Sequence, residues 1–119
     1  MSQHHQPSSL AALGRTWVEA WNTGDLERVL ALYDEAAVMT SDRIPAMGFD
    51  ASGTVRGKAA LRAYWSKALG LHFSLIDLFV SPDSVVVFYE NERGKKICEY
   101  LRVNEAGLIV QGSANHLPH

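Results

Sequence analysis

The sequence predicts an α+β domain in which three helices pack on the concave face of a strongly curved antiparallel sheet. Three helical patterns and one short strand come first along the chain, and four strand patterns separated by short turns follow. Helices grouped against an antiparallel run of strands are typical of this class. The chain has 119 residues, of which 47% are apolar, so it can bury one core without a metal or a disulfide. We expect the domain over residues 10–116, after a flexible tail over residues 1–9.

A helix hairpin is expected at the N-terminal end of the domain. Apolar residues recur at steps of three and four over residues 10–21, and Ser8 or Ser9 can cap this first helix. Residues 22–25 then break the helix, because glycine suits the left-handed C-terminal position and aspartate caps the helix that follows. The second helix is expected over residues 26–33.

A short strand, a long loop and a third helix are expected next. Residues 37–41 are partly β-branched, which predicts a strand. Residues 42–56 contain one proline and two glycines, and loops of this length are usually lids or binding loops. The third helix is expected over residues 58–69, where an apolar stripe runs as far as Gly70.

Four strands are expected to complete the domain, at residues 72–80, 84–91, 95–103 and 108–116. The turns between them are short enough for antiparallel hairpins. Polar and apolar residues alternate poorly over residues 85–89, although a sheet with one wet face should alternate. We therefore expect a homodimer in which a second copy covers the outer sheet face. The alternative is a strand buried wholly within one subunit.

Charge and composition exclude several classes of partner. The net charge is −2 and no basic stripe interleaves with aromatic residues, so neither nucleic acid nor a membrane is expected as a partner. No apolar run approaches the roughly 20 residues that span a bilayer. The single cysteine, Cys98, has no partner for an intrachain disulfide, and residues 1–9 lack an apolar signal core. A cytoplasmic location is therefore expected.

Local motifs add a family resemblance. The segment Trp17–Asp25 (WVEAWNTGD), continued by DLERVLALY and by Ala37-Val38, resembles the opening of SnoaL-like proteins of the nuclear-transport-factor-2-like superfamily. Residues 55–62 (VRGKAALR) resemble their third-helix entry. The resemblance implies a cone-shaped, cystatin-like fold around an apolar pocket, covering nearly the whole chain. It implies no single chemistry, because this superfamily includes ketosteroid isomerase, polyketide cyclases, dehydratases and members without known activity.

Resemblance to ketosteroid isomerase implies three site positions. That reaction needs a carboxylate base and two donors to the oxygen of a carbonyl group. By alignment the base position falls on Ser41, and the two donor positions fall on Trp17 and Glu99. Glu99 can fill the role of a protonated donor, because burial in an apolar cavity raises the pKa of a carboxyl group. Ser41 has no partner that would make it a base, so the base role needs Asp42, one residue along, to turn inward.

Glu99, Asp42 and Ser41 are therefore the catalytic candidates. Glu99 shares one face of its strand with three aliphatic residues, which is unexpected for a carboxyl group on a surface. The alternative is that Glu99 lies at an edge or pairs with an arginine such as Arg62 or the Arg102 of a second copy of the chain. The alternative for Asp42 is that it caps a turn with its own backbone.

Four other polar residues are expected to have structural roles. Asp77 alternates with apolar neighbours and should face solvent or the dimer contact. His72 and His116 lie at opposite ends of strands without a recognisable partner, and Cys98 has no activating group nearby in sequence. Neither a helical histidine pair nor clustered ligand spacing occurs, so no metal and no other cofactor is expected.

The expected ligand is a small, mostly apolar molecule. Bulky apolar residues from several elements are expected to line its pocket: Trp17, Tyr33, Met39, Met47, Phe49, Trp65 and Leu101. Three functions remain open at this point. The first is binding of this ligand, and the second is an isomerase, cyclase or dehydratase that uses Glu99 as general acid or hydrogen-bond donor on a carbonyl substrate. The third is a non-catalytic dimerising interaction module, which needs an exposed apolar patch beyond the dimer contact.

Overall fold

The computed structural model describes residues 5–68 and 70–118. The helices within these ranges are α1 (Pro7–Thr23), α2 (Leu26–Leu30), α3 (Arg43–Ala46) and α4 (Lys58–Trp65). The strands are β1 (Tyr33–Thr40), β2 (Thr54–Arg56), β3 (Ser74–Ser81), β4 (Ser84–Glu90), β5 (Lys96–Val103) and β6 (Ile109–His116). They form one sheet in the order β2-β1-β6-β5-β4-β3.

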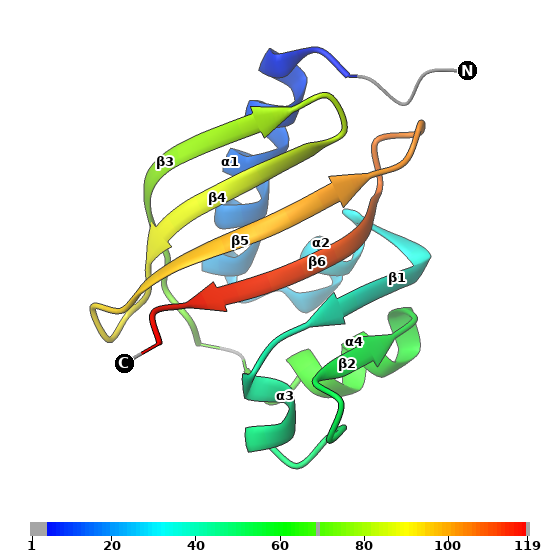
Figure 1. Cartoon of the computed structure of the whole chain (residues 1–119), viewed down its shortest axis with the longest axis vertical. Coiled ribbons are helices and arrows are strands. Elements are labelled where there is room, and N and C mark those ends of the chain that lie inside the picture. The colour runs from blue at the N-terminus through cyan, green and yellow to red at the C-terminus, as the bar shows by residue number, and fades with distance from the viewer. Residues whose placement is uncertain (1–4, 69, 119) are drawn as a thin grey trace.

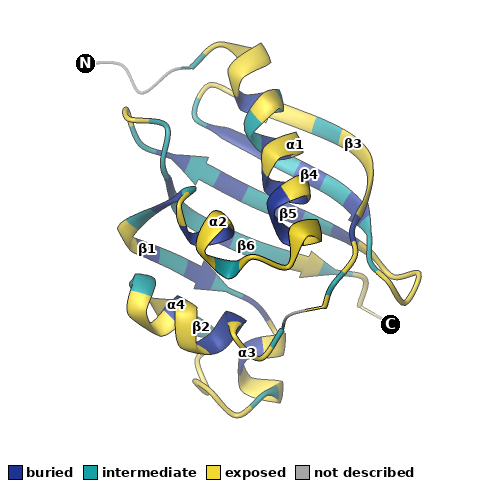
Figure 2. Ribbon diagram, turned by 180° about the vertical axis from the view of Figure 1, so that it is seen from behind, coloured by how far each residue is buried: buried dark blue, intermediate teal, exposed yellow. Residues whose placement is uncertain are grey.

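The predicted α+β class and the curved sheet are confirmed. Helices α1 and α2 lie against one face of the sheet, and no helix covers the opposite face (Figure 1, Figure 2). Neighbouring strands are antiparallel except for β1 and β6, which are parallel. The expectation of a purely antiparallel sheet was therefore wrong at this pair. The reason is that β6 returns beside β1 only after a long connection through α3, α4 and four other strands.

The first helix begins earlier than predicted, at Pro7. Proline suits the first helical position because its missing N–H and fixed φ cost nothing there. The preceding residue, Gln6, makes no side-chain cap, and the two serines predicted as caps lie inside the first turn. Residues 7–9 of the predicted tail are thus helical, whereas residues 1–4 lie outside the described ranges. Gly24 ends the helix as predicted, with a left-handed φ of 74°.

The second helix is shorter than predicted and ends at Leu30. Asp25 caps it as expected, since its carboxylate accepts hydrogen bonds from two amides of the first turn, at 3.0 and 3.4 Å. Tyr33, predicted as a helix residue, is instead the first residue of β1 and pairs with Ile109 of β6. This long-range pairing lies outside what local periodicity reports, and it extends the strand backward at the expense of the helix.

The predicted loop over residues 42–56 holds both α3 and β2. Strand β2 pairs with β1 and places Val55 beside Met39. The additional short helix α3 makes four helices rather than three in the described ranges. The predicted third helix corresponds to α4 and ends at Trp65, while Leu69, expected in its apolar stripe, lies outside the described residues. The last four strands begin and end within two residues of their predicted bounds.

The outer face of the sheet is apolar in part. Val85, Val87 and Tyr89 of β4 are buried on the helix side, while Val86 and Phe88 on the opposite side are half-buried. The weak alternation over this strand therefore reflects two different apolar faces rather than a strand buried on both sides. A membrane-crossing helix, which would have to be long and apolar, does not occur among the described residues.

Candidate functional site

A cavity of about 610 Å³ lies between one end of the sheet and the surrounding helices. It is bounded by α1, the β1–α3 junction, α4, the β4–β5 turn and the end of β6. Its apolar lining consists mainly of Trp17, Trp21, Met39, Met47, Trp65, Phe73, Tyr89 and Ile97. Its polar lining includes Ser41, Asp42, Arg43, Tyr64, Glu99, His116 and the residues 91–96.

Aromatic rings form the wall of the cavity. Trp17 stacks on Phe73 with ring centroids 5.5 Å apart, and Phe73 lies 4.3 Å from Tyr89. Trp21 meets Trp65 edge-on at 5.3 Å. Stacked and edge-on geometries are favourable beyond the area that they bury, so each ring holds its neighbour in place. All three tryptophans of the chain line the cavity.

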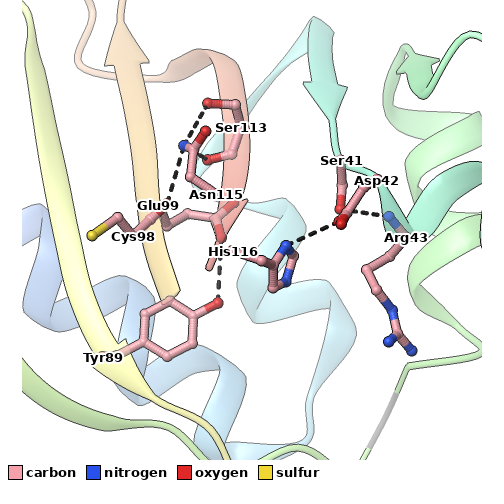
Figure 3. Close-up of polar contacts among 9 residues, drawn as sticks. All are labelled: Ser41, Asp42, Arg43, Tyr89, Cys98, Glu99, Ser113, Asn115 and His116. Carbon is pink, nitrogen blue, oxygen red and sulfur yellow. Dashed lines mark hydrogen bonds and ion pairs between the residues drawn. The ribbon is translucent and has the colours of Figure 1, made fainter. Parts of the chain in front are cut away.

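Glu99 lies at the floor of the cavity, on the helix-facing side of β5. Glu99 is 2% exposed, and the Tyr89 hydroxyl donates a hydrogen bond to Glu99 Oε1 at 3.3 Å (Figure 3). Burial raises the pKa of Glu99 from 4.5 to about 8, against the opposing effect of the Tyr89 hydrogen bond. The carboxyl group therefore keeps its proton at neutral pH and can donate one hydrogen bond into the cavity.

No arginine of the same chain pairs with Glu99 within the described residues. Arg62 binds Glu27 instead, with its Nη2 atom 2.9 Å from Oε1, on the exposed surface between α2 and α4. Arg102 alternates to the opposite face of β5 and donates to Gln111 at 3.2 Å. Strand β5 also lies between β4 and β6, so Glu99 is not at a sheet edge.

His116 and Asp42 form a second polar group, at the mouth of the cavity. Their Nδ1 and Oδ1 atoms lie 3.0 Å apart, without the alignment of a hydrogen bond (Figure 3). The His116 side chain is 25% exposed and that of Asp42 is 72% exposed. This contact was not predicted from the sequence, because the two residues approach each other only through the parallel pairing of β1 and β6. A signal was present in β6, where inward positions alternate from Gly112 through Ala114 to His116.

Ser41 has a local structural role. Its hydroxyl accepts a hydrogen bond from the Arg43 amide at 3.1 Å, so Ser41 makes the turn contact that was considered for Asp42. Asp42 makes no side-chain cap of its own. Nearby, burial raises the pKa of Tyr64 against the opposing charge of Arg43, and this phenol stays a hydrogen-bond donor.

Seven of the ten residues named from the sequence line the cavity: Trp17, Met39, Ser41, Asp42, Met47, Trp65 and Glu99. Tyr33 and Leu101 are buried in the core beside it. The Tyr33 hydroxyl accepts a hydrogen bond from Trp17 Nε1 at 2.9 Å, and burial raises the pKa of this tyrosine. Phe49 is 37% exposed and packs edge-on against Tyr64 with ring centroids 5.1 Å apart.

Several lining residues were not predicted as site residues from the sequence, chiefly Trp21, Tyr64, Phe73, Tyr89 and His116. Helical spacing shows that Trp21 follows Trp17 on one face of α1, but not that this face borders a cavity. The buried Trp21 indole N–H has no hydrogen-bond partner among the described residues. Within the same residues no three His, Cys, Asp or Glu side chains lie close enough to hold a metal ion.

Known proteins resemble this chain in sequence and in fold. The SnoaL-like domain family matches residues 15–111, and no curated protein shows significant sequence similarity. A SnoaL-like protein of unknown function from Burkholderia thailandensis is 29% identical with a TM-score of 0.90, over 96% of this chain and 98% of that chain.

Two more distant neighbours share the fold. RV0760c from Mycobacterium tuberculosis, in complex with estradiol-17β-hemisuccinate, is 21% identical with a TM-score of 0.65, over 89% of this chain and 92% of that chain. TerC, co-crystallised with polyporic acid, is 14% identical with a TM-score of 0.76, over 92% of each chain. Since the family match spans most of the sequence and the fold agrees with it, this chain belongs to the SnoaL-like domain family.

Proposed function

We propose that this chain binds a small, mostly apolar molecule in the cavity and that Glu99 donates a hydrogen bond to an oxygen atom of that molecule. The observation that carries the proposal is an aromatic wall around one buried carboxyl group, whose pKa is raised by that burial. Apolar surface supplies affinity in such sites, and a few polar groups fix the orientation of the ligand. A volume of about 610 Å³ is within the range of small-molecule sites.

Two structural neighbours support the proposal. One was crystallised with estradiol-17β-hemisuccinate and the other with polyporic acid. Both share the fold of this chain, so the scaffold accommodates small molecules. The Glu99 proton is a property of this sequence and this cavity, and it is the part of the proposal that needs a direct test.

A matched pair of probes tests the hydrogen bond. 2-Acetylnaphthalene carries a carbonyl acceptor, and 2-ethylnaphthalene has nearly the same shape without one. Quenching of tryptophan fluorescence reports binding of either compound, because every tryptophan lines the cavity. We expect the ketone to bind about 2- to 10-fold more tightly, the amount that one net hydrogen bond contributes. Glu99→Gln keeps a donor and should retain this preference, whereas Glu99→Leu should remove it.

The control is Ala114→Phe, which fills the cavity from β6 and should weaken both probes equally. Its folding is checked by circular dichroism. If neither naphthalene binds the wild-type chain, the cavity is not a site for such molecules and the proposal fails. If both compounds bind equally well, the proposed binding in the cavity is supported, but the proposed hydrogen bond from Glu99 is contradicted.

A second candidate function is proton transfer on a carbonyl compound, as in an isomerase, cyclase or dehydratase. The observation that favours it is the His116–Asp42 contact in the same cavity as Glu99. When the carbonyl oxygen of a ligand accepts a hydrogen bond from Glu99, the protons on the carbon next to the carbonyl group become more acidic. An imidazole supported by a carboxylate can accept one of these protons. The chemistry needs both groups to reach one ligand.

Hydrogen–deuterium exchange tests this candidate with the same ketone. The methyl protons of 2-acetylnaphthalene exchange in D₂O when a base removes them, and nuclear magnetic resonance follows the loss of their signal. We expect the wild-type chain to speed exchange, and His116→Gln to reduce this by about 100-fold or more, as for a general base. Exchange no faster than in buffer would leave the chain as a binding protein.

We also propose a homodimer formed through the outer sheet face. Apolar side chains lie side by side there, with Val86 beside Tyr100 and Phe88 beside Cys98, and Phe79 at the edge is 56% exposed. Burial of such a strip stabilises association. Sedimentation equilibrium should show a dimer for the wild-type chain and a monomer for Phe88→Glu. A wild-type monomer at micromolar concentration would contradict this proposal.

A further inference from the structure

The mouth of the cavity carries an excess of positive charge. Its charged side chains, apart from the histidine, are four bases and two acids: Arg43, Arg93, Lys95, Lys96, Asp42 and Glu92. The whole chain has a net charge of −2, so the positive excess is local to the mouth. Local fields of this kind raise the concentration of ligands of opposite charge at a cleft.

The two acids of the mouth have partners within the protein. Asp42 lies 3.0 Å from His116, and Glu92 Oε2 lies 3.8 Å from Arg93 Nε. No ion pair with any residue in the described ranges is formed by the other three bases, Arg43, Lys95 and Lys96. Both acids are thus engaged. Three bases form no ion pair within the described residues, and Arg93, whose side chain is 70% exposed and meets Glu92 through Nε, keeps its other guanidinium donors for a ligand.

The floor of the cavity has the opposite character. Glu99 is 2% exposed and accepts a hydrogen bond from Tyr89, and no base in the described part of the chain forms an ion pair with it. An anionic group of a ligand placed there would lose its hydration without gaining a positive partner, which is costly. The mouth and the floor therefore select different ends of one molecule.

The separation of these two regions sets the length of such a molecule. Lys95, directly before β5, and Glu99 are four residues apart on the same face, which is about 13 Å of extended chain at 3.3 Å per residue. Aromatic side chains occupy the wall between them, where a body of two or three fused or linked rings matches both the length and the apolar surface.

We propose that the ligand is an anionic amphiphile: a ring-containing apolar body, an oxygen acceptor at the buried end beside Glu99, and one anionic group, such as a carboxylate, at the outer end beside Arg93 and Lys95. This inference rests on the proposed function, because it needs the cavity to hold a small molecule. It adds the charge of that molecule and the direction in which it enters.

Two fluorescent probes separate the anion from the apolar body. 8-Anilinonaphthalene-1-sulfonate and N-phenyl-1-naphthylamine share the same rings, and only the first carries a sulfonate. Energy transfer from the lining tryptophans reports each of them inside the cavity. Salt should weaken binding of the sulfonate probe and leave the neutral probe nearly unchanged, because ions screen exposed charges.

The test variant is the double charge reversal Arg93→Glu with Lys95→Glu. The matched control is Arg28→Glu with Arg56→Glu, which changes the net charge equally at exposed residues that do not line the cavity. In the test variant we expect the dissociation constant of the sulfonate probe to rise on the order of tenfold, from the loss of two exposed ion pairs and the repulsion that replaces them. The control should change it by less than about twofold.

The outcomes distinguish this inference from the proposed function. A selective loss of the sulfonate probe in the test variant, with the neutral probe unaffected, supports the inference. Equal binding of both probes to every variant, or an equal loss of both, contradicts the proposal that the ligand carries an anionic group at its outer end. The apolar site would still stand. If the neutral probe fails to bind the wild-type chain and Ala114→Phe has no effect on either probe, the proposed function itself is overturned.

Discussion

The inner face of the sheet has a filled half and a hollow half, and the same strands run through both. In the filled half α1 packs directly on the sheet. A Cβ atom on Gly14 would lie 2.6 Å from the Leu78 Cδ2 atom and 3.4 Å from both Val85 and Val87, so a larger residue here would have to displace the end of the Leu78 side chain. In the hollow half the helices stand off from the sheet, and the cavity takes the space between them.

Residue type changes as each strand passes from one half to the other. The inward positions of the filled half are mostly aliphatic: Val85 and Val87 of β4, Leu101 and Val103 of β5, and Ile109 of β6. Those of the hollow half include aromatic and polar residues: Tyr89 of β4, Glu99 of β5, and Ala114 and His116 of β6. Burial alone therefore does not define a site, since Tyr89 and Glu99 of the hollow half are nearly as buried as the aliphatic residues of the filled half.

The largest expected effect is a difference between two positions of β5. Leu101→Ala opens a new void in the filled half, so we expect it to lower the free energy of unfolding by about 2–5 kcal/mol. Ile97→Ala enlarges a space that already exists, so it loses the transfer energy of the removed atoms but little of the cavity energy. Urea unfolding of both variants measures the difference, which should exceed about 1 kcal/mol.

Equal costs for the two substitutions would break the comparison. That result would mean that the cavity walls close around a truncated side chain at Ile97, or that the hollow half is as tightly packed as the filled half. The urea m-value, which scales with the surface exposed on unfolding, must stay constant for the two free energies to be compared.

The second prediction concerns the pH dependence of stability. The pKa of Glu99 is raised from 4.5 to about 8 in the folded chain, so between these values the folded state binds more protons than the unfolded state. The contribution of Glu99 to the free energy of unfolding is therefore fully present below pH 4.5. It is lost as the pH rises to about 8, by up to about 1.4 kcal/mol per pH unit. Glu99→Gln removes this slope, because an amide does not titrate.

The measurement is a series of urea unfolding curves from pH 4.5 to pH 8.5 for the wild-type chain and Glu99→Gln. The difference between the two chains cancels the contributions of the histidines, which titrate in both. Parallel curves would show that Glu99 is ionised in the folded chain at neutral pH, and the floor of the cavity would then be far better hydrated than its burial indicates.

The smallest expected effect lies at the boundary between the two halves. Tyr33→Phe removes the acceptor of the Trp17 indole N–H and should cost about 1 kcal/mol of unfolding free energy, the net value of one hydrogen bond. Trp17 also lines the cavity, so its emission should shift when the bond is lost. Tyr100→Phe on the outer face is the matched control, since this hydroxyl has no hydrogen bond to the described residues. A shift in the control but not in Tyr33→Phe would contradict the assignment.

The last four strands and the order of the longer elements could be predicted from the sequence, because periodicity and turn residues are local signals. The short elements α3 and β2 lay within a predicted loop. The placement of Glu99 could be predicted as well: its alternation with aliphatic residues along β5 indicated an inward face, and the structure buries it there. Tyr33 was misplaced in a helix, since its pairing with Ile109 is a contact between distant parts of the chain. The His116–Asp42 contact was missed for the same reason.

The sequence by itself determined the class of fold, the family and the inward position of one carboxyl group among apolar residues. Each of these follows from the order and spacing of neighbouring residues. Only the tertiary structure decided that Leu101 and Tyr33 fill the core while Tyr89 and Glu99 border a cavity. It also decided that the bases of the β4–β5 turn surround the mouth of that cavity. The physical reason is that a cavity is the space left between elements, and its volume depends on how closely α1 and the sheet approach, which residue spacing along one strand does not encode.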